Sequence, residues 1–228
     1  MDFTHILQYS KDLAAHNDRV WFHAHHDEYD RAKKEFYGLL DLLRFRICEV
    51  APALEPDLLY ALPKDWAYRV ARDMRFHKNG PPYNPAWRAY LAADKKSWMP
   101  VGYYLSIFPG RSLFGTGLWC ESTAQSNVVR DYISANYAEF DALVQGCAVP
   151  LEGQTVKTMP RGYDKNDPAA EYLRYKNWEL IAYLPDEEFT TFDRFMDTAA
   201  ALVREMEPVR QFLLAAAKSV DGEQEFEW

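Results

Sequence analysis

The chain has 228 residues, a formal net charge of −8, thirteen Phe, fifteen Tyr and seven Trp. This length and aromatic content predict a well-packed α+β domain rather than a disordered chain. The acidic balance argues against nucleic acid or an acidic membrane as partner, because such binding depends on phosphate neutralisation. No apolar run approaches the roughly 18 residues of a membrane span, and no secretory signal is evident.

The cysteines Cys48, Cys120 and Cys147 are far apart in the sequence. This spacing predicts neither a disulfide framework nor a zinc ribbon. We therefore expect reduced thiols in a cytoplasmic protein.

Two helical regions are expected in the first quarter of the chain. Apolar residues predict a short amphipathic helix over residues 3–15. Asn17 is then the expected N-cap of a second region, whose apolar stripe continues to Val50. We expect one long helix or two collinear helices here, with a kink or break at Gly38.

A sheet is expected in the middle of the chain. Residues 66–72 alternate as in a half-buried strand, and 86–93 form either a strand or a short helix. Residues 101–108 and 112–119 form a hairpin around a Pro-Gly turn. Gly115 and Gly117 in its returning strand indicate a bulge, or a place where a ligand or a neighbouring backbone comes close.

The second half of the chain is mainly helical by its pattern. Residues 122–146 predict helix with a break near Asn136, and Asp167-Pro168 predicts the start of a short helix. Residues 178–184 predict a last strand, and a helical region follows that Pro208 kinks or divides. Together the elements predict helices packed on a mainly antiparallel β-sheet in a single domain of residues 1–220. The acidic tail, residues 221–228, is expected to be flexible.

A short basic segment stands out in this acidic chain. Arg69, Arg72, Arg75 and Lys78 lie within ten residues, with Asp73 as the internal counter-charge. Guanidinium groups stay charged and their planar fork suits carboxylate and phosphate, so the segment predicts a site for an anionic ligand. The alternative is a set of arginines paired with neighbouring carboxylates. Strand alternation through Arg72 would place Arg69 and Arg72 on opposite faces, so the four basic residues converge only if the chain bends near Asp73.

Several motifs in this order resemble one known family. They are Asn17-x3-Trp21-Phe22-x6-Tyr29; Arg69-x2-Arg72-Asp73-x-Arg75-Phe76-x-Lys78 with Pro82-Tyr83; Gly102-Tyr103-Tyr104; Gly115-x-Gly117-Leu118-Trp119; and Pro160-Arg161-Gly162-Tyr163-Asp164 with Pro168. Over residues 3–215 the chain resembles the bacterial and fungal family catalogued as domain of unknown function 2461. The resemblance implies a single α+β domain, usually a stand-alone cytoplasmic protein, and implies no activity. Gly80 and Asn84 depart from it, because lysines are common there in the family.

The anion hypothesis names one set of side chains. Cations come from the basic segment and a later loop, and tyrosines supply hydroxyl or ring contacts. The set is Arg69, Arg72, Arg75, Lys78, Tyr83, Arg161, Tyr163 and Lys165. Asp73 is the candidate general base, although a carboxylate among cations also serves simply to hold them in place.

A metal site is the second hypothesis. His23 and His26 are separated by three residues and would share a helix face. The preferred interpretation is a solvated helix, because no motif of the H-E-x-x-H type is present. No nucleophile elbow, Walker loop or C-x-x-C motif occurs either. We therefore predict no cofactor, and the sequence decides neither enzymatic activity nor oligomeric state.

The preferred function is binding, with turnover left open, of a small phosphate- or carboxylate-bearing molecule at an Arg/Lys-lined cleft. The alternative is a non-catalytic interaction or regulatory module that uses the aromatic-rich sheet.

Overall fold

The chain folds into two compact units, each drawn from three segments of the sequence. A computed structural model describes residues 3–54, 58–75, 80–92 and 97–219. Unit 1 comprises Met1–Leu91, Tyr104–Phe114 and Ala182–Ala201; unit 2 comprises Ala92–Tyr103, Gly115–Ile181 and Leu202–Trp228. The predicted tail, 221–228, lies outside the described residues. A single domain over 1–220 stays a prediction.

The described strands form one five-stranded antiparallel sheet in the order β1-β2-β3-β5-β4. The strands are β1 (Trp87–Ala92), β2 (Gly102–Ile107), β3 (Ser112–Leu118), β4 (Leu151–Glu152) and β5 (Trp178–Leu184). The predicted hairpin and the predicted last strand are confirmed, and residues 86–93 resolve to a strand. β4, which the sequence pattern did not predict, pairs with β5 through Leu151 and Leu180.

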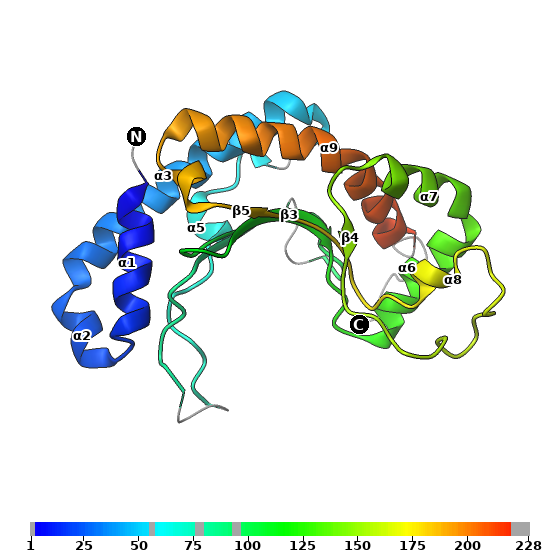
Figure 1. Ribbon diagram of the computed structural model, residues 1–228, viewed down its shortest axis with the longest axis horizontal. Coiled ribbons are helices and arrows are strands. Elements are labelled where there is room, and N and C mark those ends of the chain that lie inside the picture. Colours follow the sequence, from blue (N-terminus) through cyan, green and yellow to red (C-terminus); the bar gives the residue numbers. More distant parts are fainter. Residues whose placement is uncertain (1–2, 55–57, 76–79, 93–96, 220–228) are drawn as a thin grey trace, which may run out of the picture. The chain divides into compact units, whose positions relative to one another are not determined.

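Helices account for most of the remaining described chain, which confirms the α+β class (Figure 1). They are α1 (Thr4–Ala15), α2 (Arg19–Ala24), α3 (His26–Val50), α5 (Pro63–Trp66), α6 (Thr123–Ala135), α7 (Tyr137–Gly146), α8 (Ala170–Leu173) and α9 (Phe192–Lys218), with short 3-10 turns η1 (Pro52–Leu54) and η2 (Asp186–Phe189). Within the described residues, no helix combines the length and apolarity needed to cross a membrane.

The N-terminal helices of unit 1 correct two expectations. The chain turns at His25, which separates α2 from α3, while α3 continues through Gly38 without a break. Asp18, not Asn17, caps α2, because its carboxylate accepts a hydrogen bond from the Trp21 N–H at 2.9 Å. The buried stripe of α3 has the 3.6-residue spacing that the sequence predicted; its members are Ala32, Phe36, Leu39, Leu40, Leu43 and Ile47.

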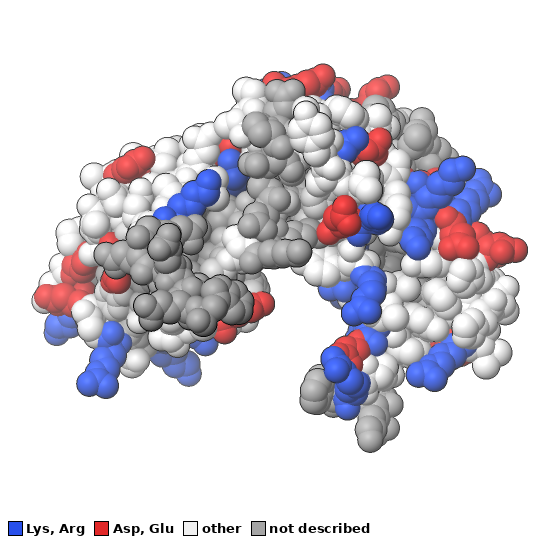
Figure 2. All heavy atoms as spheres, turned by 180° about the vertical axis from the view of Figure 1, so that it is seen from behind, with Lys and Arg blue, Asp and Glu red and all other residues white. Residues whose placement is uncertain are grey.

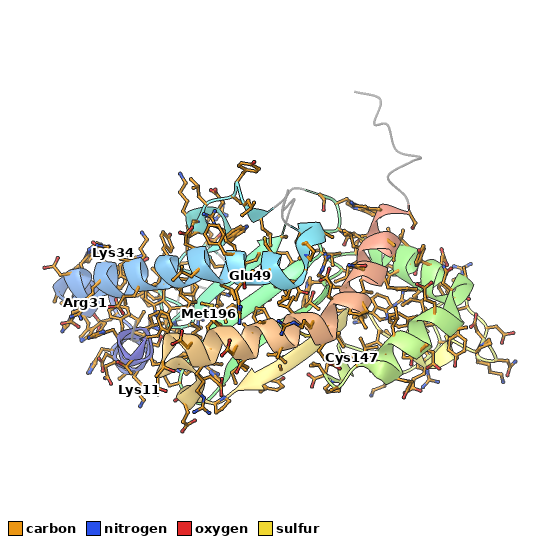
Figure 3. The ribbon with its side chains drawn as sticks, turned by 90° about the horizontal axis from the view of Figure 1, so that it is seen from above. Lys11, Arg31, Lys34, Glu49, Cys147 and Met196 are labelled. Carbon is orange, nitrogen blue, oxygen red and sulfur yellow. The ribbon has the colours of Figure 1, made fainter. Side chains whose placement is uncertain are left out.

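In unit 1, α3 and the start of α9 run side by side (Figure 3). Arg46 of α3 bridges them, because its guanidinium donates to Asp197 of α9 at 2.8 Å and to Glu49 of its own helix at 2.7 Å. Figure 3 labels Glu49 and Met196 on the two helices.

The break predicted near Asn136 is confirmed, since it separates α6 from α7 in unit 2. Pro208, in contrast, does not divide α9, which is continuous through it. Next to it lies a buried polar network: Arg210 donates to both carboxylate oxygens of Glu207, at 2.6 and 2.7 Å, and the Tyr103 hydroxyl donates at 2.6 Å. Burial alone would raise the pKa of the Glu207 carboxyl, but these hydrogen bonds outweigh it and lower the pKa.

The two glycines of β3 are explained by the neighbouring strand. A Cβ atom at Gly115 would collide with the carbonyl oxygen of Leu180, and one at Gly117 with that of Trp178. Gly117 also has φ +153°, a conformation that side chains disfavour. The close approach expected from the sequence is therefore that of the β5 backbone.

Candidate functional site

Unit 2 contains a hollow of about 650 Å³ beside the start of α6. This volume lies within the range of roughly 300–1,000 Å³ that is typical of small-molecule sites. One side is formed by the segment that enters α6, and the other by the loop that follows β4. The lining residues are Cys120, Glu121, Ser122, Thr123, Ser126, Arg130, Val156, Thr158, Met159, Pro160, Arg161 and Lys176.

A capping box fixes the start of α6 against the hollow. The Ser122 hydroxyl accepts a hydrogen bond from the Gln125 N–H at 3.2 Å, and the Gln125 side-chain oxygen accepts from the Ser122 N–H at 3.0 Å. The first two helical amides, those of Thr123 and Ala124, have no acceptor within the helix. Their N–H groups and the helix dipole add a positive potential at this end of the hollow.

Arg130 is the buried cation of the hollow, with a relative exposure of 3%. Its guanidinium donates to the carbonyl oxygens of Leu173 at 2.8 Å and Tyr175 at 2.7 Å, and to the Asn127 side chain at 2.8 Å. It also lies 6.0 Å from the ring centroids of Tyr163 and Trp178. Desolvation lowers the pKa of Arg130, but an arginine stays protonated in a folded protein. Its hydrogen bonds therefore join α6 to the 173–175 segment without neutralising its charge.

Arg161 and Lys176 are the exposed cations of the hollow. Among the described residues, neither side chain has a hydrogen-bond acceptor, and no carboxylate forms an ion pair with either of them or with Arg130. Glu121 is the acidic residue in the lining. Because hydrogen bonds from a cationic side chain are strongest when the acceptor is negatively charged, the arrangement suits an anion.

Tyr163 holds the loop that carries Arg161 against α6. Its hydroxyl donates to the Asp131 carboxylate at 2.7 Å and lies 3.1 Å from the Asn127 carbonyl oxygen. Burial and the adjacent Asp131 carboxylate raise the pKa of Tyr163, so the hydroxyl keeps its proton. Tyr163 is therefore a positioning residue. Lys165 is exposed and does not line the hollow.

Cys120 places a thiol in the lining of the hollow, but this thiol is a poor nucleophile. Burial raises its pKa to about 11, in spite of opposing contributions from Ser126 and the charge of Arg130. Because the thiolate is the reactive form, the protonated thiol contributes little nucleophilicity near neutral pH.

The basic segment forms part of an arm in unit 1, defined as residues 67–75 and 80–86. The two halves pair antiparallel through an isolated bridge between Ala71 and Tyr83, and a second isolated bridge joins Ala67 to Ala89 of β1. The expected strand over 66–72 is thereby corrected, since Trp66 ends α5 and the rest forms bridges only. Pro82 and Pro85 lack the N–H groups that a continuous ladder needs. Figure 2 shows Lys and Arg side chains along this arm, interrupted by acidic atoms.

Within the arm, Arg69, Arg72 and Arg75 are exposed. Asp73 accepts two hydrogen bonds of 3.0 Å from the Arg75 side-chain Nε–H and lies in an ion pair with the same guanidinium. These hydrogen bonds, and then the charge of Arg69, lower the pKa of Asp73. This geometry matches a carboxylate that holds an arginine. Lys78 lies outside the described residues, and ligand binding by the arm stays a prediction.

Tyr83 is buried, and its contacts are those of a residue that packs in the protein interior. Its ring stacks on Phe22 with centroids 4.1 Å apart. Its backbone is held by the Asn17 side chain, which accepts from the Tyr83 N–H at 3.0 Å and donates to its carbonyl at 3.1 Å. Asn17, which directly precedes the α2 cap Asp18, therefore ties the arm to the start of α2. The sequence did not reveal this role.

The metal candidates do not assemble into a ligand set. His23 lies on α2 and His26 on α3, on either side of the turn at His25, and His26 pairs with Asp30 at 3.1 Å. Across the described ranges, no group of three or more His, Cys, Asp or Glu side chains is placed to hold a metal.

Of the residues in and around the hollow, the sequence analysis predicted Arg161 and Tyr163 as site residues but not Arg130 and Lys176. The S-x-x-Q spacing of Ser122 and Gln125 is a readable signal for a helix start. Two of the three hydrogen-bond partners of Arg130 are backbone carbonyls more than forty residues away, which no local pattern discloses.

The fold and the hollow define an α+β protein with a cation-lined pocket in its second unit. A family model described as a conserved hypothetical protein, DUF2461, matches residues 5–212. The chain therefore belongs to this family, as the resemblance of its motifs indicated. Comparison with curated proteins and with solved structures gives no match.

Proposed function

We propose that the protein binds a small anionic molecule, bearing a phosphate or carboxylate, in the hollow of unit 2. The observation that supports this is the set of three cations, Arg130, Arg161 and Lys176, around a space of about 650 Å³ and without an ion-pair partner among the described residues. Buried Arg130 contributes a positive electrostatic potential in the hollow, while the exposed side chains of Arg161 and Lys176 would contact the ligand.

The proposal moves the centre of the predicted site from the arm to the hollow. It keeps Arg161 as a ligand contact and Tyr163 as its support. The Cys120 thiol of the lining is not an activated nucleophile, since its pKa is raised to about 11. Binding, rather than covalent catalysis by this thiol, is the activity that the hollow supports.

A thermal-shift titration tests the site with inorganic phosphate and acetate. A ligand that binds only the folded protein raises its melting temperature. We expect a rise for the unmodified protein and none for the double variant Arg161→Ala/Lys176→Ala. The matched control is Lys157→Ala/Arg174→Ala, which removes one exposed lysine and one exposed arginine of unit 2 that do not line the hollow.

A third variant, Arg69→Ala/Arg72→Ala, tests the arm as the rival site. A response lost in this variant and kept in the hollow variant would place the anion at the arm.

An interaction module is the second candidate, favoured by exposed aromatic rings. Trp119 at the end of β3 and Tyr183 in β5 have relative exposures of 58% and 64%. Exposed aromatic side chains are enriched at protein interfaces. Self-association that Trp119→Ser abolishes, measured by light scattering, would support this role.

A further inference from the structure

The lining of the hollow combines a positive charge, hydrogen-bond donors and an apolar side. We propose that the ligand is a phosphomonoester in its dianionic form, with an apolar ester group, held as a free small molecule. This inference rests on the proposed function, because it specifies the ligand of the same site.

The charge of the lining matches a dianion. Arg130, Arg161 and Lys176 contribute three positive charges, and Glu121 one negative charge. The surplus is two, whereas a carboxylate ligand carries one negative charge. A phosphomonoester carries close to two above its second pKa of about 6. Compensation of the charge of the lining residues therefore favours the phosphomonoester. Asp131, which also acts on Arg130 electrostatically, lies outside the lining and already accepts a hydrogen bond from the Tyr163 hydroxyl.

The donors of the lining suit a group with three acceptor oxygens. Arg161 presents a planar fork of N–H groups and Lys176 an ammonium. Thr123 and Thr158 add exposed hydroxyls to the lining, and the first amides of α6 add backbone donors. A carboxylate has two oxygens and cannot use donors on both sides of the hollow as fully as a tetrahedral phosphate.

The apolar side of the hollow indicates what the phosphate is attached to. Val156, Met159 and Pro160 lie within five residues of one loop, and each is half-buried. A methionine adapts to ligands of irregular shape. Because the hollow has a volume of about 650 Å³, it exceeds what a phosphate ion alone would fill. An aryl or short alkyl ester group would cover this apolar surface.

Isothermal titration calorimetry at pH 7.5 with four probes tests the proposal. Phenyl phosphate is the reference; phenyl sulfate has the same shape with one charge fewer, benzoate replaces phosphate by carboxylate, and inorganic phosphate lacks the ester group. We expect phenyl phosphate to bind about tenfold more tightly than each of the others, the factor for one charge-assisted hydrogen bond or one buried apolar group. Its affinity should fall as the pH drops below about 6, where the phosphate becomes a monoanion.

Two variants separate the contributions. Met159→Gln should reduce the affinity for phenyl phosphate to that for inorganic phosphate, whereas Arg161→Ala/Lys176→Ala should abolish both. The control Lys157→Ala/Arg174→Ala should bind like the unmodified protein.

A sedimentation experiment distinguishes a free small molecule from a membrane lipid. Vesicles of phosphatidylcholine with phosphatidic acid should not sediment the protein; co-sedimentation would make a membrane lipid the source of the phosphate and overturn the small-molecule assignment.

The outcomes distinguish this inference from the proposed function. Equal affinity for phenyl sulfate or benzoate would overturn the dianion and leave the anion site standing. Equal affinity for inorganic phosphate would overturn the apolar ester group. Failure of all four probes to bind would overturn the anion site itself.

Discussion

The basic arm of unit 1 and the hollow of unit 2 each hold three described cations, but they differ in what surrounds these cations. In the arm, Arg69, Arg72 and Arg75 are neighbours in sequence, and Arg75 is paired with Asp73. In the hollow, Arg161 and Lys176 come from separate segments and have no carboxylate partner among the described residues. Arg69 and Arg72, however, form no ion pair among the described residues either. The two regions therefore differ mainly in geometry, because the cations of the hollow surround a space of about 650 Å³, whereas the arginines of the arm do not line that space.

The buried arginine of the hollow gives the sharpest test of this contrast. Arg130→Met removes the donors to the carbonyls of Leu173 and Tyr175 and leaves both without a partner. We expect the free energy of unfolding, measured in urea, to fall by about 3 kcal/mol. Arg69→Met in the exposed arm should leave it unchanged. A loss below about 1 kcal/mol for Arg130→Met would mean that its hydrogen bonds contribute little.

The thiol of the hollow reports on its burial. With a pKa raised to about 11, Cys120 carries far less thiolate at pH 8 than a free cysteine of pKa about 8.5. Alkylation by iodoacetamide, followed by mass spectrometry of the Cys120 peptide, should be about 100-fold slower than for a free cysteine. The rate should rise with pH toward 11. The same peptide labelled in urea is the control, and equal rates in the folded and unfolded protein would contradict a buried thiol.

The arm depends on one side chain outside it. Asn17→Ala removes both hydrogen bonds to the Tyr83 backbone, and we expect a loss of about 2 kcal/mol in unfolding free energy. Amide exchange at Tyr83 should accelerate. Asn17→Asp keeps the acceptor for the Tyr83 N–H and should lose about half as much. Anion binding in the hollow should not change in either variant, and a change there would contradict the independence of the two sites.

The smallest effect is expected at the ion pair of the arm. The folded-state pKa of Asp73 is lowered, so its contribution to stability is present above the ordinary pKa of the carboxyl and is lost as the pH falls. Because the pair is exposed, solvent screens it. Asp73→Asn should leave the urea midpoint unchanged at pH 7 and at pH 3. A midpoint lowered at pH 7 alone would show that the pair stabilises the arm.

Much of the fold could be predicted because its signals are local. The bounds of β5, a short run rich in apolar residues, and the break near Asn136 were both predicted from the residues of these segments alone. The division at His25 and the continuity of α9 through Pro208 did not follow from local propensity, which tertiary context routinely overrides.

The site was less accessible to prediction. Arg161 and Tyr163 stood out because a loop that carries cations and an aromatic ring is visible in a sequence. Lys176 was hidden, since a single lysine before a strand has no distinguishing pattern. The cluster at Arg69–Arg75 was conspicuous because sequence reading weights proximity along the chain, while a ligand responds to proximity in space.

The glycines of β3 place a limit on how this protein can vary. At Gly115 and Gly117 the only tolerated side chain is a hydrogen atom, because the β5 carbonyls occupy the space of any larger group. In a library of all single substitutions, these two positions should be depleted of nearly every variant, whether or not the selection involves a ligand. Room for replacement lies instead in the lining of the hollow, on the segment that enters α6 and in the loop after β4, where the residues are half-buried or exposed.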